Sequence, residues 1–313
     1  MAKHVKPLQI GIDVSKSELW IQQTDGDSAV TLPNEYTAIR PWLRTLPRGS
    51  ALALEATNTY HLVLAEEAYR LGLSVHLIDG LRLNRYRESV GGRAKTDRTD
   101  AQLLRRYLIK EGDELRAWEP PPKAYQQAQR LLRRRAKLVE ARKTLLQSLQ
   151  DIPGLKQPLQ SLLLRIKRLE QLLEKRLREQ LCEAEWDVPA KRCAAIEGIG
   201  PLTAAALTMS FHRGHFRSSD AFIAFLGLDV KVRDSGQQRG RRKLTKQGDP
   251  ELRRLLHNAA MAAVRSPVWQ PVYQRYLDRG LARTQALVAV ARKLVRIAFA
   301  LLRSGEIYRP KMA

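Results

Sequence analysis

The first third of the chain alternates between short apolar runs and helical patterns. Five short runs, either continuously apolar or alternating with polar residues, predict strands at Leu8–Asp13, Glu18–Thr24, Ala29–Leu32, Ala51–Leu54 and Ser74–Ile78. Apolar residues at helical spacing predict helices at Thr37–Leu46, Tyr60–Leu71 and Asp97–Ile109. Strands first, followed by strands alternating with helices, indicate an α/β domain.

Long helical patterns follow a proline-rich break at Trp118–Lys123. Ala124–Gln150 carries leucines at heptad spacing, and the next helix has an apolar stripe of Leu162, Ile166, Leu169, Leu173 and Leu177. This pattern fits a helical hairpin or a coiled-coil dimerisation arm, and equally a plain two-helix packing unit within one subunit. Beyond it the chain is helical with short loops. We therefore expect an α/β domain at 1–118, a helical arm at 119–183 and a mainly α domain at 184–313.

The charge balance points to an anionic partner. Lys and Arg total 55 against 32 Asp and Glu, a formal net charge of +23 over 313 residues. Such a field attracts polyanions, of which nucleic acid is the commonest. An anionic membrane is the rival, but the basic residues are spread along the chain and form no single terminal anchor. The most apolar stretch, Ala282–Leu302, carries four basic residues and so does not predict a membrane span.

The two cysteines, Cys182 and Cys193, have no metal-ligand spacing. We expect free thiols in a reducing compartment. The N-terminal segment lacks the long apolar stretch of a signal peptide. These features together favour a cytoplasmic, nucleoid-associated protein with no membrane partner.

Four acidic residues stand where an α/β domain gathers its ligands. Asp13 and Glu55 each end a predicted strand, and ligands of such sheets bind at the carboxyl ends of strands. Asp97 and Asp100 are three residues apart on a helix and face the same way. Taken singly, each acid also fits a turn, an exposed strand end or a helix cap. Together, in so basic a chain, they favour a site for Mg2+ or Mn2+, where two ions about 3.5–4 Å apart would clamp a phosphodiester.

A Gly-Ile-Gly turn between two helical patterns is a candidate phosphate contact. Gly198 and Gly200 frame it, in the pattern of a helix–hairpin–helix element. The backbone N–H groups of such a turn, and the start of the helix that follows, can hold a phosphate. A tight turn that only joins two helices is an equal alternative. Arg133 and Arg134, in the arm, offer a second basic face for RNA or DNA.

Ser235 precedes a glycine in a loop dense in positive charge. The basic residues of this loop are Arg239, Arg241, Arg242, Lys243 and Lys246. A serine nucleophile needs activation and a stabilised transition state, and clustered guanidinium groups supply the second need. From residue chemistry alone, however, a loop that only grips a phosphate backbone is the stronger interpretation.

An ordered set of motifs along nearly the whole chain resembles the insertion-sequence 110 family of transposases, its 1111 subgroup included, and the related pilin-gene invertases. The matching motifs, in the family's order and approximate spacing, are GIDVSK, ALEAT, KTDRTDAQLL, IEGIGPLTAAAL, FRSSDAFIAFLGL and SGQQRGRRKLTKQGDPELRRLL. Each motif alone is weak, but the ordered set is highly specific. One departure is visible: the family often has Thr-Gly-x-Tyr after its glutamate, where this chain has Thr57-Asn58-Thr59-Tyr60.

The resemblance implies an N-terminal RuvC-like (ribonuclease-H-like) domain whose DEDD metal site maps onto Asp13, Glu55, Asp97 and Asp100. It also implies a C-terminal transposase domain whose nucleophile maps onto Ser235. Family members recombine DNA through a covalent phosphoserine link. A structured non-coding bridge RNA from the same element guides them and pairs with donor and target DNA. They act as homodimers that assemble into homotetramers, with active sites thought to combine different subunits.

The sequence therefore predicts a Mg2+-dependent serine transposase that cuts and rejoins DNA without net hydrolysis. Two rivals remain. A hydrolytic nuclease of the junction-resolvase type would need the four acids but not Ser235, because water would be its nucleophile. A non-catalytic nucleic-acid-binding protein would need neither, and its acids would be caps and turns.

Overall fold

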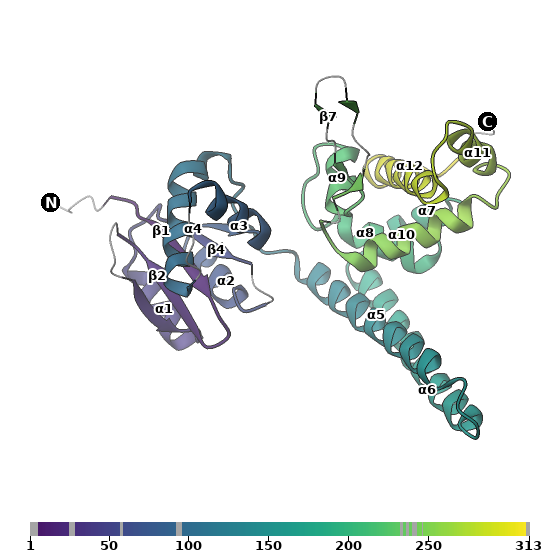
Figure 1. The fold of residues 1–313 in the computed structure, drawn as a ribbon, viewed down its shortest axis with the longest axis horizontal. Coiled ribbons are helices and arrows are strands. Elements are labelled where there is room, and N and C mark those ends of the chain that lie inside the picture. The colour runs from purple at the N-terminus through teal and green to yellow at the C-terminus, as the bar shows by residue number, and fades with distance from the viewer. Residues whose placement is uncertain are drawn as a thin grey trace. The chain divides into compact units, whose positions relative to one another are not determined.

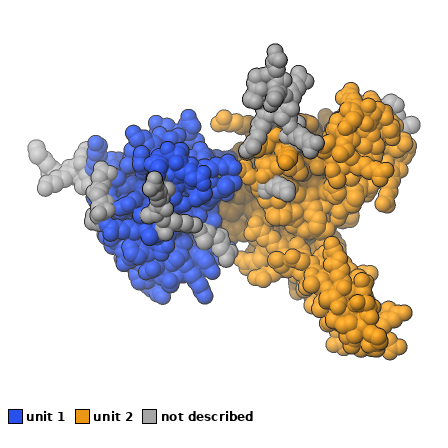
Figure 2. All heavy atoms as spheres, viewed as in Figure 1, with its two compact units in different colours: residues 1–120 blue, residues 121–313 orange. Residues whose placement is uncertain are grey.

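The computed structural model of the chain describes residues 6–24, 29–56, 59–91, 96–231, 234–235, 238–239, 243–245 and 247–310. Two compact units divide it at Pro120 (Figure 2): unit 1 holds residues 1–120 and unit 2 holds residues 121–313. The second unit includes both the helical arm and the helices that follow. The three-part division expected from the sequence stays a prediction.

A five-stranded sheet forms the centre of unit 1. Its strands are β1 (Gln9–Val14), β2 (Glu18–Gln22), β3 (Val30–Pro33), β4 (Ala51–Glu55) and β5 (Ser74–Ile78), and their spatial order is β3-β2-β1-β4-β5. The first three strands run antiparallel to their neighbours as a meander, whereas β4 is parallel to β1 and β5 is parallel to β4. The prediction of an α/β domain is confirmed, and all five expected strands are present.

Helices cover both faces of this sheet (Figure 1). α1 (Tyr36–Thr45) and α2 (Leu62–Arg70) pack on one face, against alternate strand residues such as Ile10, Ile12 and Leu54. α3 (Gly80–Ser89) and α4 (Asp97–Glu111) pack on the other face, where Ala53 and Ile78 belong to their apolar cluster. A 3-10 turn at Gly112–Glu114 ends this unit's last helix. The sequence patterns predicted α1, α2 and α4 but not α3.

Gly11 sets how closely α4 approaches the sheet. A Cβ at this position would lie 2.1 Å from the backbone oxygen of Ala101 and 2.3 Å from the backbone nitrogen of Arg105. Both atoms belong to α4, so any larger residue would collide with the helix backbone itself. The glycine of the GID motif therefore allows the helix to lie directly on the central strand.

Unit 2 begins with a helical hairpin formed by α5 (Lys123–Leu149) and α6 (Lys156–Glu183). The two helices pack on each other along their length, and buried or half-buried ion pairs join them: Arg135–Glu174 at 2.6 Å and Arg142–Glu170 at 2.8 Å. The expected leucine stripe of α6 is only partly buried: Leu177 is buried, whereas Leu162 and Leu169 are exposed. The chain thus forms the two-helix unit within one subunit, and dimerisation through this arm stays a prediction.

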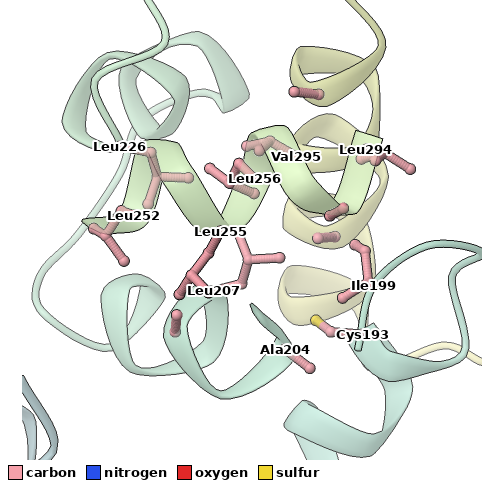
Figure 3. Close-up of a cluster of buried hydrophobic side chains, with 14 of the residues drawn as sticks. Cys193, Ile199, Ala204, Leu207, Leu226, Leu252, Leu255, Leu256, Leu294 and Val295 are labelled. Carbon is pink, nitrogen blue, oxygen red and sulfur yellow. The ribbon is translucent and has the colours of Figure 1, made fainter. Parts of the chain in front are cut away.

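The rest of unit 2 is a helical bundle around α12 (Arg283–Ser304). This helix packs against α7 (Asp187–Ala194), α8 (Pro201–Phe211), α9 (Ser219–Phe225), α10 (Pro250–Ala263) and α11 (Gln270–Asp278). Figure 3 shows the centre of the core, where Leu207, Leu255 and Leu294 from three of these helices gather. In the ranges that the structure describes, no helix has both the length and the hydrophobicity that crossing a membrane requires.

Candidate metal centre and serine ribbon

The register of the two parallel strands places Asp13 beside Glu55. Ile12 of β1 pairs with Leu54 of β4, and the next residue on each strand is one of the two acids. Side chains alternate between the faces of a sheet, so Asp13 shares a face with Gly11, the residue that α4 covers. Glu55 likewise shares a face with Ala53. Both acids therefore point to the side of the sheet on which α4 lies.

The first turn of α4 brings the other two acids to the same place. Thr96 caps the helix with its hydroxyl, which accepts a hydrogen bond from the N–H of Thr99, and the two residues form a capping box. Asp97 and Asp100 follow directly in the first turn. Asp97 is exposed, whereas Asp100 is only 4% exposed. Their position at a helix start is also what a plain capping role would give, so placement alone does not distinguish the two interpretations.

The electrostatics of Asp13 show that the four acids converge. Burial is the main cause that raises the pKa of Asp13 from 3.8 to about 6, and the charges of Asp100, Asp97 and Glu55 raise it further in that order. A hydrogen bond from the backbone of Val14 opposes this shift. Each of the other three carboxylates thus lies close enough to repel a charge on Asp13. All four acids therefore lie in one region of unit 1, within electrostatic range of Asp13, and their role as metal ligands stays a prediction.

These acids do not close around a common point. Among the described residues, no three Asp, Glu, His or Cys side chains form a finished set of metal ligands. Neighbouring carboxylates repel one another when no cation lies between them. One of the four, Asp100, forms an ion pair with Arg87. The donors are all oxygens and carry excess negative charge, which suits a hard divalent cation. The residues present therefore fit a metal, which would draw together acids that otherwise repel.

Two contacts from α3 complete the surroundings of the acids, and the sequence patterns did not predict either. The Nη2 atom of Arg87 lies 2.6 Å from Oδ1 of Asp100, in a pair that is buried on both sides. A Cβ at Gly80 would lie 2.5 Å from Oε1 of Glu55, so this glycine makes room for the carboxylate. Asp79 caps α3 by accepting from the N–H groups of Leu81 and Arg82. An Asp-Gly pair directly after a strand is the signal in the sequence for such a helix start.

The two glycines of the Gly-Ile-Gly turn differ in role. Gly198 has a φ of +83°, and a Cβ there would lie 2.4 Å from the backbone oxygen of Ala259 in α10. This glycine is needed for packing. Gly200 is exposed at the start of α8, with no atom within 4 Å of a Cβ built on it. Glu197, just before the turn, accepts hydrogen bonds from the side chains of Trp269 and Tyr308. These bonds connect the turn to the start of α11 and to the C-terminal segment. Phosphate binding by this turn stays a prediction.

Ser235 lies in a short β-ribbon between α9 and α10 (Figure 1). At its base β6 (Val230–Lys231) pairs antiparallel with β9 (Lys243–Leu244). Farther out β7 (Asp234–Ser235) pairs with β8 (Gln238–Arg239), with Ser235 opposite Gln238. The backbone of the serine is therefore held in a ladder, several residues away from the helical core. The side chains of β7 and β8 lie outside the described part of the chain.

Three predicted contact residues, Arg241, Arg242 and Lys246, fall outside the described residues. The Thr57–Asn58 pair, where the chain departs from the family's Thr-Gly-x-Tyr pattern, falls outside them too. Of those inside, Lys243 and Arg134 are exposed, as a contact with nucleic acid requires. Arg133 is exposed too, but its Nε lies 3.3 Å from Oδ2 of Asp249, the residue that caps α10. Arg133 therefore also joins the arm to the bundle.

Comparisons with known proteins agree with this arrangement. A DEDD transposase model of the IS110 type matches residues 10–152, which include all four acids, and a model described as "Transposase IS116/IS110/IS902 family" matches residues 190–275, which include the ribbon. A "Probable family 20 transposase" of Pseudomonas aeruginosa is 29% identical, over 96% of this chain and 98% of its own. A "Pilin gene-inverting protein" of Moraxella bovis is 26% identical, over 95% and 96%.

A third relative matches a smaller part of the chain than these two do. The "Insertion element IS110 uncharacterized 43.6 kDa protein" of Streptomyces coelicolor is 29% identical over 38% of this chain and 30% of its own. The two family models together match most of the chain, in the order that the motifs predicted. The DEDD model also indicates dependence on a divalent metal, in agreement with the oxygen-only set of acids. The chain belongs to the IS116/IS110/IS902 family of transposases, enzymes that cleave and rejoin DNA.

Proposed function

We propose that this transposase recombines DNA with Ser235 as the nucleophile and with Mg2+ at Asp13, Glu55, Asp97 and Asp100. The observation that carries the metal part is that Asp100, Asp97 and Glu55 all lie within electrostatic range of Asp13, where their charges add to burial in raising its pKa to about 6. The serine part is supported by the resemblance in sequence and by the position of Ser235 in a ribbon outside the bundle core. Mn2+ would satisfy the same oxygen ligands.

The proposed reaction conserves the phosphodiester. The Oγ atom of Ser235 loses its proton and forms a bond with the scissile phosphorus, while the bond from phosphorus to the leaving deoxyribose oxygen breaks and that oxygen takes up a proton. The product is a phosphoserine diester. A hydroxyl of another DNA strand then attacks this phosphorus, which rejoins DNA and restores the serine. Asp13, Glu55, Asp97 and Asp100 would hold the divalent cation, which would neutralise the charge that develops on the phosphate and on the leaving oxygen.

The basic residues position the nucleic acid in this proposal. Arg239, Arg241, Arg242, Lys243 and Lys246 would hold the backbone phosphates on either side of the scissile bond. Gly200 and Arg134 offer further contacts from unit 2. A bridge RNA that pairs with donor and target DNA would supply sequence selection, and a net charge of +23 suits a protein that binds both polyanions. Assembly into dimers and tetramers is proposed from the same resemblance.

The decisive experiment asks which atom becomes attached to DNA. The purified full chain is incubated with DNA that spans an end of the element, with the adjacent non-coding RNA and with Mg2+. Denaturing gels then separate free protein from any covalent adduct, and mass spectrometry maps the attached residue. We expect an adduct at Ser235 that is lost in Ser235→Ala and kept in Ser161→Ala, a control at an exposed serine of α6.

Two outcomes would select the rivals. Cleavage and joining that survive in Ser235→Ala would refute the serine mechanism and favour water as the nucleophile of a hydrolytic enzyme. Full recombination by a variant with both Asp97→Asn and Asp100→Asn would remove the metal site from the mechanism. Binding of DNA should weaken steeply with salt in every case, because each phosphate contact releases counterions.

A further inference from the structure

Arg87 is a buried cation next to the four acids. Its side chain is 10% exposed and that of Asp100 is 6% exposed, and Nη2 of the arginine lies 2.6 Å from Oδ1 of the aspartate. The other terminal nitrogen, Nη1, lies 2.9 Å from Oδ1 of Asn84, one turn earlier in α3. The two hydrogen bonds fix the plane of the guanidinium. The orientation of the Asp100 carboxylate is thereby tied to α3.

Burial makes this pair more consequential than an exposed ion pair. A carboxylate as buried as Asp100 is costly without a counter-charge, and removing one partner of such a pair leaves the other uncompensated. The surroundings of Asp100 add to that cost, because Asp13 is close enough to feel its charge. Arg87 thus pairs with the acid whose charge acts most strongly on Asp13.

Arg87 contacts one particular oxygen of the Asp100 carboxylate. Oδ1 accepts a short hydrogen bond from Arg87. Residues that hold a ligating carboxylate in this way fix its direction and tune its affinity for the metal. A lysine would keep the charge at this place, but its ammonium lacks the planar fork that reaches Asn84 and Asp100 together.

We propose that Arg87 is a positioning residue of the metal site: it holds Asp100 through Oδ1 and leaves Oδ2 to bind the divalent cation. The proposal rests on the proposed function, since it needs the acids to hold a metal. Arg87 touches neither the cation nor the DNA and acts only through Asp100.

Titration of the metal-free full chain with Mn2+ in a calorimeter tests this role without relying on activity. The variants are Arg87→Gln, which removes the charge, and Arg87→Lys, which keeps the charge without the fork. Loss of a residue that orients a ligand costs about 10–100-fold in metal affinity, and we expect a loss of that size in Arg87→Gln and a smaller loss in Arg87→Lys. Arg85→Gln, at an exposed arginine of the same helix, is the matched control and should bind Mn2+ like the wild type.

A second readout separates positioning from general damage to the fold. The Mn2+ concentration that gives half of the maximal covalent adduct should rise in Arg87→Gln, and excess Mn2+ should recover most of the adduct. A residue that only stabilises the fold would lower the amount of adduct at every concentration and leave the half-saturating concentration unchanged. If Arg87→Gln does not fold, the milder Arg87→Lys carries both measurements.

The outcomes distinguish this inference from the metal centre on which it rests. Mn2+ affinity in Arg87→Gln equal to that of the wild type would overturn the positioning role alone. Tighter binding would overturn it as well, because Arg87 would then compete with the cation. If the wild type and Asp13→Asn bind Mn2+ equally well, the metal centre itself is wrong and the role of Arg87 is refuted with it.

Discussion

Replacing Gly11 by alanine tests whether close packing of α4 on β1 assembles the acids. The added Cβ would lie 2.1 Å from the backbone oxygen of Ala101, 2.3 Å from the backbone nitrogen of Arg105 and 2.9 Å from its Cα. Contacts below 3.0 Å essentially never occur at a Cβ, and these atoms cannot rotate away because they belong to the helix backbone. The first turn of α4 must therefore retreat from the sheet by about 1 Å or more.

The size of this shift gives the expected effect. Overpacking costs typically about 1–3 kcal/mol, and a rigid obstacle places Gly11→Ala at the upper end of that range. Asp97 and Asp100 retreat with α4, and a misplacement of about 1 Å can cost about 100-fold in rate. We expect faster amide hydrogen exchange in peptides from β1 and α4, weaker Mn2+ binding and about 100-fold slower adduct formation.

A matched control lies in the same unit. Gly112 has helical backbone angles, and a Cβ there would meet only Cδ1 of Leu108, at an ordinary 3.6 Å. Gly112→Ala should therefore leave metal binding unchanged and should change stability by no more than about 1 kcal/mol. Wild-type exchange and adduct formation in Gly11→Ala would refute the reasoning, because they would mean that the added Cβ fits without displacing α4 or its acids.

Three further predictions concern the acids, the arm and the thiols. The pKa of Asp13 is about 6 in the folded chain, against an ordinary value of 3.8 that applies in the unfolded chain, so the charged form destabilises the metal-free fold. Asp13→Asn should therefore raise the melting temperature at pH 7, and this gain should vanish as the pH falls through 6 to below 3.8. Arg142→Met leaves the buried Glu170 without its partner and should destabilise the arm by about 1–3 kcal/mol in hydrogen exchange, whereas Lys175→Met, in an exposed pair, should cost under about 1 kcal/mol. Burial raises the pKa of Cys193 to about 11, so a thiol reagent should modify the exposed Cys182 in the native chain and Cys193 only after unfolding; equal rates would contradict the packing of α7.

Much of unit 1 follows from the sequence because its signals are local. Strand periodicity places β1 and β4, and the rule that ligands meet at the carboxyl ends of parallel strands brings Asp13 to Glu55. The spacing of Asp97 and Asp100 puts both on one turn of a helix. Each of these arguments uses a few consecutive residues, and the structure places the other three acids within electrostatic range of Asp13, while their role as metal ligands stays a prediction.

The parts that sequence reasoning missed depend on tertiary contacts. Only Leu83 and Arg87 are buried among the described side chains of α3, so its sequence lacks the apolar stripe that predicts a helix. Its three arginines suggest an exposed loop instead. The role of Gly198 is set by α10, some sixty residues later, which no local pattern can reveal. Ser235 is different again: only the resemblance to a family assigns its chemistry, since its own surroundings fit a phosphate-gripping loop equally well.

The division of the acids between the first strand and the last helix of unit 1 has a consequence for synthesis of the chain. Domains fold as units while the chain emerges, and contacts between distant segments form late. β1 leaves the ribosome with one acid, but the site lacks half of its carboxylates until α4 has also emerged. If the four acids hold the divalent cation as proposed, a nascent transposase therefore lacks two of its four metal ligands until its whole sheet domain has been made.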